Sequence, residues 1–446
     1  MKILFIQSPS VEDQTKERVY PIGIVILATI AENSGHSVAL IDMNLEEDPF
    51  AAVKSAVKTE AYDLIGISLR NIDPLGNKNV SLVPPFFTLI TLLRTLTPHS
   101  KIIVGGTGFS LFPRELMEQA RPDFGLIGEG EIAFPAFLQA FPETPQKLSG
   151  LCYFDDRGDL HLNAPAPIFD LKNYISPNYR LLPPDRYAHI NQYAPAIGVE
   201  TRRGCPLKCA YCSYPLLQGK KIRCRPVKDI VDEIETLYKE YHIRIFHFND
   251  PVVNMPSAHL DAICEEILRR NLKIQWTGFF RENNLNRENV SLYVRSGCNC
   301  FSLSPDGLSQ AARNILKKDL SENDLYRAAE LIAETGVCSL YHFMVNVPNE
   351  NSKSIEESKK MIDAIYRIHR KKKSIGYVVL NQIRLLPQTE STRQAIAEGV
   401  IEENQSLLYP LYYNPKPYQN LRYELEALCQ RKNTFMWYDI KEKEKQ

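Results

Sequence analysis

Three cysteines with the spacing of metal ligands are the residues of this sequence best suited to redox chemistry. Cys205, Cys209 and Cys212 are separated by three residues and then by two. Gly204 and Pro206 beside them favour a loop, and a loop can wrap three thiolates around one metal centre. Four irons bound by only three nearby cysteines leave one iron without a protein ligand. The triplet therefore predicts a metal centre with an open coordination position, where a cofactor or substrate can bind.

Two simpler interpretations of the triplet stay open at this point. A zinc site would need a fourth ligand, and Cys224 is the nearest cysteine that could supply one. Alternatively, the three thiols could be buried and bind nothing. The wide separation of Cys224 from the triplet resembles no paired zinc knuckle, so the sequence favours the cluster.

The triplet, with the aromatic Tyr211 just before its last cysteine, resembles the signature of the radical S-adenosylmethionine (SAM) superfamily. In that family the three thiolates hold a [4Fe-4S] cluster, and the amino and carboxylate groups of SAM bind the fourth iron. An electron from the reduced cluster cleaves SAM to give a 5′-deoxyadenosyl radical. The resemblance implies cluster-ligand roles for Cys205, Cys209 and Cys212, a contact between the backbone of Tyr211 and adenine, and an electron donor such as flavodoxin or ferredoxin.

Composition limits the class of protein. A chain of 446 residues predicts two or three domains, and 53 basic against 53 acidic residues give no reason to expect a nucleic-acid partner. Ten cysteines, three of them clustered, indicate reduced thiols and a metal site rather than a disulfide framework. No apolar run approaches the length of a membrane span. Because Met1-Lys2 leads directly into a strand-like segment, we expect no signal peptide and a cytoplasmic location.

Short apolar strands alternate with helical segments at the start of the chain. This alternation predicts an α/β domain over residues 1–143, with a doubly wound parallel sheet and helices on both faces. The predicted strands cover residues 2–7, 37–42, 64–68, 101–104 and 124–127, and the predicted helices cover about 21–34, 51–59 and 85–96. Ligands of such sheets bind at the carboxyl ends of the strands.

Small and polar residues gather at these predicted strand ends. Successive glycines let the backbone approach a large flat ligand, although a tight turn is the simpler explanation of any single pair. The ligand candidates are Pro21, Gly23, Ser68, Leu69, Arg70, Gly105, Gly106, Thr107, Gly108, Gly128, Glu129, Gly130 and Glu131.

This series, with a strand that ends at Asp42, resembles the cobalamin-binding domain of cobalamin-dependent radical SAM enzymes. The resemblance implies that the candidates contact cobalamin. No Asp-x-His-x-x-Gly motif is present, so it implies no histidine lower ligand; Arg70 is then expected beneath the corrin, with an ion pair to Asp73 as the simpler alternative. Methylthiotransferases share the cysteine triplet, but their N-terminal domains carry three more cluster cysteines, whereas the first cysteine here is Cys152.

Later segments predict a linker and a second α/β domain. Residues 144–194 are rich in proline, and residues 150–162 predict a β-hairpin that would pack between the domains. Predicted strands lie near 197–201, 244–248, 274–278, 300–304, 339–345 and 376–383, and predicted helices near 227–240, 257–269, 288–295, 321–335 and 354–369. Six repeats predict a partial (β/α)6 barrel of the TIM type over residues 195–390, with chemistry at the strand carboxyl ends. Residues 391–446 are expected to form a small helical cap.

The resemblance also implies SAM contacts at the carboxyl ends of the barrel strands. The candidates are Tyr211, Asp250, Arg281, Ser304, Asp306, Asn346, Pro348 and Leu385, and each could instead be a cap or turn former. The glutamate of the usual Glu-Ser pair is absent beside Ser304. Asn346 and Asn349 replace the glycines of the family's Gly-x-Pro-Gly-Glu turn, and asparagine tolerates the same left-handed backbone.

Together these resemblances imply an enzyme that uses a [4Fe-4S] cluster, SAM and cobalamin. We expect it to methylate an unactivated carbon of a small-molecule or natural-product substrate, with the corrin between the first sheet and the mouth of the barrel. Two alternatives stay open: a rearrangement, cyclisation or oxidation without methyl transfer, and a non-catalytic metal-binding module. The barrel interior varies within the family, so the sequence names no substrate.

Overall fold

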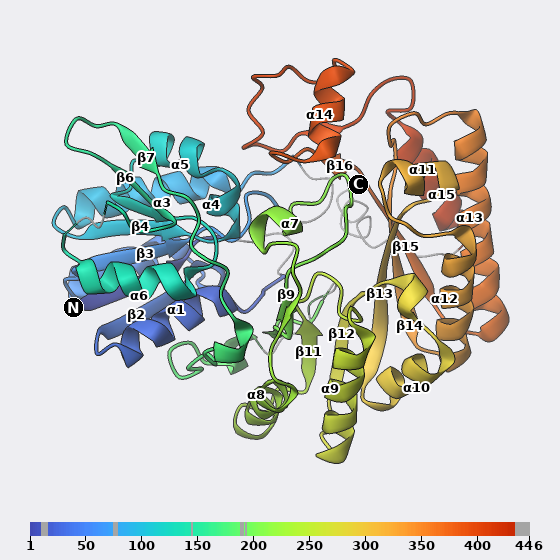
Figure 1. Cartoon of the computed structure of the whole chain (residues 1–446), viewed down its shortest axis with the longest axis horizontal. Helices are drawn as coiled ribbons and strands as arrows, with labels where there is room; N and C mark the ends of the chain where they lie inside the picture. Colours follow the sequence, from blue (N-terminus) through green and yellow to red (C-terminus); the bar gives the residue numbers. More distant parts are fainter. Residues whose placement is uncertain (10–16, 75–78, 144–145, 188–190, 192–193, 433–446) are drawn as a thin grey trace. The chain divides into compact units, whose positions relative to one another are not determined.

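The computed structural model describes residues 1–9, 17–74, 79–143, 146–187, 191 and 194–432. They form two compact units, each built around a mainly parallel sheet (Figure 1). The first unit contains residues 1–192 with the short segments 216–219 and 406–410, and the second contains the rest.

The first unit is built on a seven-stranded sheet with the order β2-β1-β3-β4-β5-β6-β7. Its strands are β1 (Lys2–Gln7), β2 (Ser37–Asp42), β3 (Leu64–Ser68), β4 (Lys101–Gly105), β5 (Phe124–Leu126), β6 (Leu151–Phe154) and β7 (Leu160–Leu162). The first five are parallel, and β1 pairs with β2 on one side and β3 on the other. The strand order therefore reverses at β1, which makes the carboxyl edge beside β1 and β3 the expected ligand site of this fold.

Helices cover both faces of this sheet, as predicted (Figure 1). They are α1 (Ile22–Asn33), α2 (Pro49–Thr59), α3 (Val83–Leu96), α4 (Thr107–Leu111), α5 (Pro113–Ala120) and α6 (Gly130–Ala140). α1 contacts α6, whereas α3 contacts α2 and α5. The α1 and α6 face is sealed by aromatic side chains, with the ring of Phe134 on α6 5.7 Å from that of Phe5 on β1. The sequence analysis missed α6, because Gly128 to Glu131 indicated only a loop.

The hairpin predicted at residues 150–162 is present as β6 and β7, but it continues the first sheet. β6 pairs antiparallel with β5, with Leu151 opposite Leu126. Leu151 and Tyr153 join Phe124 in the apolar core of this unit. Its apolar side chains are buried against the neighbouring strand and helix, and the expected packing of the hairpin between the domains stays a prediction.

The second unit contains a six-stranded sheet with the order β15-β14-β13-β12-β11-β8, and every pair in it is parallel. The strands of the unit are β8 (Gly198–Val199), β9 (Arg202–Arg203), β10 (Arg223–Cys224), β11 (Ile245–Phe248), β12 (Gln275–Phe280), β13 (Cys298–Gly307), β14 (Cys338–Met344), β15 (Gly376–Asn381), β16 (Ile383–Arg384) and β17 (Tyr412–Tyr413). No pairing joins β8 to β15 within the part of the chain described here, so the predicted partial barrel is open along one side.

Helices on one face of this sheet follow one another in contact, from α8 through α9, α10 and α12 to α13. The helices of the unit are α7 (Tyr214–Leu217), α8 (Val227–Glu240), α9 (Ser257–Arg269), α10 (Arg287–Arg295), α11 (Gln310–Ile315), α12 (Glu322–Thr335), α13 (Ser352–Lys372), α14 (Glu390–Ala397) and α15 (Leu421–Arg431). Trp276 and Phe280 of β12 pack on Tyr293 of α10, so this face of the sheet is the buried core. The opposite face lines the interior of the open barrel.

The C-terminal segment, expected as a helical cap, contributes α14 and α15. α15 contacts β15 and α13, and β16 pairs antiparallel with β17. Residues 433–446 of the expected cap lie outside the described residues. Where the chain is described, no helix is both long enough and apolar enough to cross a lipid bilayer.

Candidate active site

A loop between two short antiparallel strands holds the cysteine triplet. β9 pairs with β10, so residues 204–222 form a closed loop just beyond the carboxyl end of β8. Gly204 opens the loop with a φ of +86°, and a Cβ there would lie 2.1 Å from the carbonyl oxygen of Lys221. Only glycine accommodates this conformation and this close approach.

The three thiols of the triplet are close enough to interact electrostatically with one another. Cys205 is buried, and Cys209 and Cys212 are half-buried. Burial raises the pKa of Cys212 to about 12, and it also raises the pKa of Cys209. Binding a metal centre releases the protons of the thiols that ligate it.

The kind of metal centre that the triplet could hold depends on how its thiols are spread. Zinc draws its ligands around a single centre, whereas a cubane cluster spreads its thiolates over different irons. Three thiols on one loop are compatible with such a cluster, and their role as cluster ligands stays a prediction.

Asp250 lies beneath the cysteine loop. Its carboxylate accepts hydrogen bonds from the backbone nitrogens of Thr201 (2.9 Å) and Arg202 (3.1 Å), and from the Thr201 hydroxyl. The buried Arg202 guanidinium in turn donates to the carbonyl oxygens of Val252 and Gly204, each at 2.8 Å. Burial raises the pKa of Asp250 to about 6. This geometry makes Asp250 a support of the loop, and its predicted contact with SAM stays a prediction.

A buried ion pair borders the triplet on its other side. The Asp306 carboxylate accepts a hydrogen bond from the Tyr211 hydroxyl and lies 2.6 Å from Lys318 Nζ. Lys318 is also close enough to Cys209 and Cys212 for electrostatic interaction. The structure thus brings together two predicted site residues, Tyr211 and Asp306, with a lysine that the sequence analysis missed. No local pattern marks Lys318, since it follows a short helix in a run of polar residues.

Arg281, predicted to lie near SAM, fixes the segment that carries Lys318. Its Nη2 donates to the carbonyl oxygens of Lys318 (2.7 Å) and Asp319 (2.8 Å). Next to it, Glu282 is buried with Oε1 lacking a hydrogen-bond partner, and burial raises its pKa to about 7. These two residues at the end of β12 therefore extend the polar network below the triplet.

The remaining SAM candidates lie at three other strand ends. Ser304 is half-buried on β13. Asn346 has a φ of +56°, as expected for a residue in place of glycine, and its side chain donates to the segment 414–415. Pro348 and Leu385 are buried, so only the backbone of Leu385 is suited to a ligand contact. Their predicted contacts with SAM stay predictions.

The barrel interior above the network is lined by imidazoles and an aromatic ring. Side chains alternate along a strand, so Thr277 and Phe279 point away from the helices that cover Trp276 and Phe280. His247 Nδ1 lies 2.7 Å from Thr277 Oγ1, and the ring of Phe279 contacts His247 and His342. Burial lowers the pKa of His342 to about 4. The interior thus offers hydrogen-bonding groups beside an aromatic face.

Several candidates at the carboxyl edge of the first sheet are accounted for by loop packing. A Cβ on Gly106 would lie 2.6 Å from the Leu69 carbonyl oxygen, and one on Gly108 3.0 Å from the same atom. Leu69 is fully buried, and its nitrogen donates to the carbonyl oxygen of Gly105 at 2.9 Å. These glycines let two loops touch, which is the simpler explanation that the sequence left open. The side chain of Leu69, predicted to contact cobalamin, belongs to the core.

Other small residues at this edge face open space. Among the described residues, and apart from its chain neighbours and its own helix backbone, no atom lies within 4 Å of a Cβ built on Gly23, and the nearest to one on Gly128 is Pro165 Cβ at 4.0 Å. Gly23, Thr107 and Gly128 are all exposed. The edge therefore leaves room for a large flat ligand to approach the backbone, which fits the predicted corrin.

The acidic candidates lie at the start of α6. The Glu129 carboxylate accepts a hydrogen bond from the Phe169 nitrogen at 3.1 Å. Gly130 begins the helix, where a Cβ would lie 2.9 Å from the side chain of Leu27. Glu131 is half-buried in the first turn. Glu129 thus supports the following chain, and Gly130 is required by helix packing.

The last candidates border the strand ends where the order of the sheet reverses. The Ser68 carbonyl oxygen accepts hydrogen bonds from Ser8 Oγ (2.8 Å) and Gln7 Nε2 (3.2 Å), two residues that the sequence analysis did not single out. Pro21 is buried just before α1, and Arg70 is half-buried. The prediction that Arg70 lies beneath a corrin stays a prediction.

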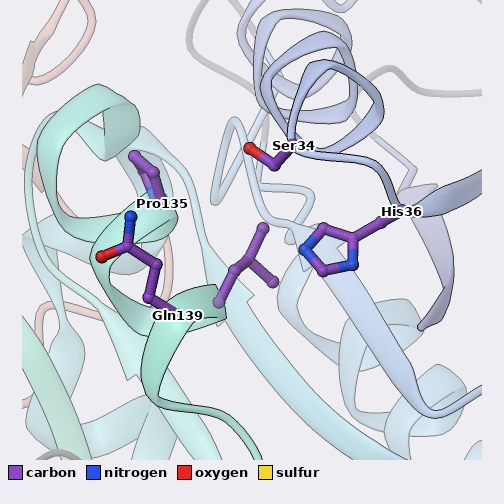
Figure 2. A pocket seen from close by; sticks show the side chains of 5 residues that line it. Ser34, His36, Pro135 and Gln139 are labelled. Atoms are coloured by element: carbon purple, nitrogen blue, oxygen red, sulfur yellow. The ribbon is translucent and has the colours of Figure 1, made fainter.

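A separate cavity lies at the opposite edge of the first sheet. Figure 2 shows its lining, which consists of Ser34, His36, Pro135, Leu138 and Gln139. His36 directly precedes β2 and lies 3.4 Å from the Met1 amino group, so the cavity borders the amino ends of the strands. Because the candidate residues lie at the carboxyl ends, this cavity takes no part in the site.

Comparison with known families assigns each unit. The B12 binding domain model matches residues 13–138, and the radical SAM superfamily model matches residues 199–362. The two domains in this order define the cobalamin-dependent radical SAM enzymes, and the chain belongs to that class.

Individual proteins agree with this assignment. An uncharacterized methyltransferase of Pyrococcus horikoshii is 25% identical over 90% of this chain and 84% of its own length. The anaerobic magnesium-protoporphyrin IX monomethyl ester cyclase of Rubrivivax gelatinosus is 24% identical over 76% of this chain and 61% of its own length. TsrM from Kitasatospora setae, a radical SAM methyltransferase solved with cobalamin and a [4Fe-4S] cluster, superposes with a TM-score of 0.74 at 20% identity over 89% of this chain and 75% of that one. Another TsrM structure contains tryptophan as substrate and a SAM analogue.

Proposed function

We propose that this protein methylates an unactivated carbon of a small molecule, using a [4Fe-4S] cluster, SAM and cobalamin. The observation that carries the proposal is the meeting of three thiols at the carboxyl edge of an open parallel sheet, in a chain whose other domain is of the B12-binding type. The resemblance to methyltransferases of the same domain order supports methyl transfer as the reaction.

The bound groups supply the electron, the radical and the methyl group, and the protein supplies their positions. Cys205, Cys209 and Cys212 hold the cluster. The hydrogen bonds of Asp250 and Arg202 to the backbone at the start of the cysteine loop keep this loop in place. The barrel interior excludes water with packed side chains and orients the substrate, because fixed groups remove the entropy cost of alignment during the reaction.

The barrel interior favours an uncharged part of the substrate at the reacting end. Phe279 offers an aromatic face, and His247 and Thr277 offer hydrogen-bonding groups beside it. The aromatic face of Phe279 favours a planar or apolar group over a hydrated, charged one. A substrate with a planar or apolar part and a hydroxyl or carbonyl group fits this lining.

Loss of one cluster ligand tests the metal centre. Cys205→Ala removes a thiolate and should abolish cluster assembly and SAM cleavage, measured as iron bound and 5′-deoxyadenosine formed under anaerobic conditions. Cys224→Ala is the matched control, because Cys224 is the nearest other cysteine and is half-buried on β10. Full cleavage in Cys205→Ala, or loss of the metal centre in Cys224→Ala, would contradict the ligand assignment.

Methyl-labelled SAM tests the reaction. Incubation with substrate candidates, cobalamin and a reductant should give labelled product together with both 5′-deoxyadenosine and S-adenosylhomocysteine, detected by mass spectrometry. Label transfer without deoxyadenosine would exclude a radical route. Candidates are best chosen among planar small molecules with hydroxyl or carbonyl groups, following the lining of the barrel.

A second candidate function is a cyclisation, rearrangement or oxidation without methyl transfer. The similarity to the magnesium-protoporphyrin monomethyl ester cyclase favours it, although this chain spans only 61% of that relative. Deoxyadenosine formed without S-adenosylhomocysteine, with an unmethylated product, would support this reaction over methylation.

A further inference from the structure

Lys318 is buried beside the cysteine triplet, although it is not among the site residues predicted from the sequence. Its side chain is 7% exposed, and within the described ranges it is the only lysine in the buried part of the protein. A buried ammonium group is costly unless it is paired and hydrogen-bonded. Its position therefore calls for a physical reason.

The segment that carries Lys318 is held in a defined backbone conformation. Lys317 and Asp319 on either side of it have left-handed backbones, with φ values of +56° and +51°. Arg281 donates to the two carbonyl oxygens of Lys318 and Asp319. Left-handed conformations of non-glycine residues persist only where the surrounding structure enforces them. The protein thus fixes the direction in which Lys318 points.

The cysteine loop is tied to the same segment. The nitrogen of Ala210, between Cys209 and Cys212, donates to the Leu316 carbonyl oxygen at 3.1 Å. Tyr211 then contacts Asp306, the ion-pair partner of Lys318. Backbone and side-chain contacts therefore hold the ammonium group and the triplet in one rigid arrangement.

Lys318 keeps its charge in this position. The Asp306 carboxylate, 2.6 Å from Lys318 Nζ, compensates the buried ammonium charge. Arg281, which directly follows β12, also acts electrostatically on Cys209. The triplet consequently faces a fixed positive charge whose own counter-charge is Asp306.

We propose that Lys318 and Asp306 set the reduction potential of the cluster held by the triplet. This inference rests on the proposed function. Reduction adds one electron from an electron-transfer protein of the flavodoxin or ferredoxin type, with no bond made or broken. A fixed cation near the thiolates stabilises the more negative, reduced cluster, and the neighbouring carboxylate opposes that effect. Lys318 thus acts electrostatically on the cluster through its thiolate ligands and does not bind the cluster itself.

Substitutions of opposite sign test the inference. Lys318→Met should lower the ratio of reduced to oxidised cluster at a fixed applied potential at least tenfold, which corresponds to about 59 mV for a one-electron couple. Asp306→Asn should raise this ratio, and the double variant should return close to the wild-type value. The matched control is Lys317→Met, because Lys317 is exposed and pairs with Glu390 at 2.7 Å; it should leave the ratio unchanged.

The measurement is a redox titration of the reconstituted protein without SAM, followed by electron paramagnetic resonance. Wild-type protein that binds no cluster would contradict the proposed function itself. A cluster whose potential is the same in wild type, Lys318→Met and Asp306→Asn would overturn only the present inference, as would shifts of the same sign in both variants. If Lys318→Met assembles no cluster, Lys318→Arg keeps the charge and should match wild type, while the rise in Asp306→Asn remains decisive.

Discussion

The carboxyl edges of the two sheets differ in how many charged side chains are buried there. In the described residues of the first unit, Asp42 at the end of β2 is the single buried charged side chain, and the half-buried Arg70, Glu129 and Glu131 lie near the same edge among serines and glycines. In the second unit, Arg202, Asp250, Arg281, Asp306 and Lys318 are all buried around the cysteine loop. The carboxyl edge of the first sheet thus has few buried charges, whereas that of the second sheet has several.

This difference teaches how each unit can recognise its cofactor. A large neutral ring system needs room and backbone contacts, which glycines provide without charge. A cluster that changes charge during its reaction responds to fixed charges nearby, and these are strongest where water is excluded. Buried charges are stable only with partners, so the second unit depends on many mutual contacts that the first does not need.

The largest expected effect comes from breaking a buried ion pair below the cysteine loop. Arg225 Nη2 lies 2.6 Å from Glu233 Oε2, with both side chains fully buried, and Arg225 Nη1 donates to the Glu200 carbonyl oxygen at 2.7 Å. Arg225→Met leaves the Glu233 carboxylate buried without its counter-charge. We expect a loss of about 3–5 kcal/mol in the free energy of unfolding, measured by urea titration with Trp276 fluorescence.

An exposed pair of the first unit provides the control for this comparison. Lys101 Nζ lies 3.1 Å from Asp123, and half of the lysine side chain is exposed. Exposed pairs contribute little, so Lys101→Met should leave the unfolding midpoint of the first unit unchanged. Equal losses in Arg225→Met and Lys101→Met would show that the two units do not differ in their dependence on paired charge.

The next effect concerns acid. His369 is buried on α13, with Nε2 2.8 Å from the Tyr341 hydroxyl and Nδ1 2.8 Å from Ser374 Oγ. Burial lowers its pKa from 6.5 to about 4. Between these two pH values His369 is protonated in the unfolded chain but not in the folded one. The free energy of unfolding therefore decreases as the pH falls from about 6.5 to about 4.

The variant His369→Gln isolates this contribution. The difference in unfolding free energy between wild type and variant should be constant above pH 7 and should shift against the wild type by roughly 3 kcal/mol by pH 4. Urea titrations at several pH values measure it, and the value at pH 7.5 gives the packing cost of the substitution alone. A difference that does not change with pH would mean that the pKa of His369 is the same in the folded and the unfolded chain.

The sequence predicted the parts of the site that are local in the chain. The cysteine triplet lies within one loop, and the alternation of strands and helices repeats along the chain, so both were found. Lys318, Arg202 and Glu282 come from three separate segments, and nothing in their local patterns distinguishes a buried charge from a solvated one. They acquire their roles only when the parallel strands bring their carboxyl ends together.

Glycines set a different limit on prediction. The sequence shows where a Cβ is missing but not what occupies its place. At Gly106 the Leu69 carbonyl oxygen lies 2.6 Å from a Cβ position, whereas at Gly23 no atom of another described segment lies within 4 Å. Both glycines were predicted to contact cobalamin for the same reason, and the structure separates them into a packing residue and a residue that faces open space.

The smallest expected effect sharpens this distinction at the edge of the first sheet. Gly106→Ala forces a side chain into a backbone with a φ of +99° and against Leu69, which should destabilise the first unit by about 1–3 kcal/mol. Gly23→Ala lies in the first turn of α1 and should leave stability unchanged or raise it by up to ~1 kcal/mol.

Cobalamin titration, followed by absorbance, then distinguishes a residue that contacts cobalamin from a residue that only stabilises the fold. If the corrin approaches the backbone at Gly23, the added methyl group should weaken binding about tenfold, a cost of ~1.4 kcal/mol, in a protein of full stability. Gly106→Ala should weaken binding only in proportion to its unfolded fraction. Unaltered affinity in Gly23→Ala would remove this residue from the cobalamin site and would confine the corrin to the side of the edge formed by Thr107 and Gly128, the other exposed small residues there.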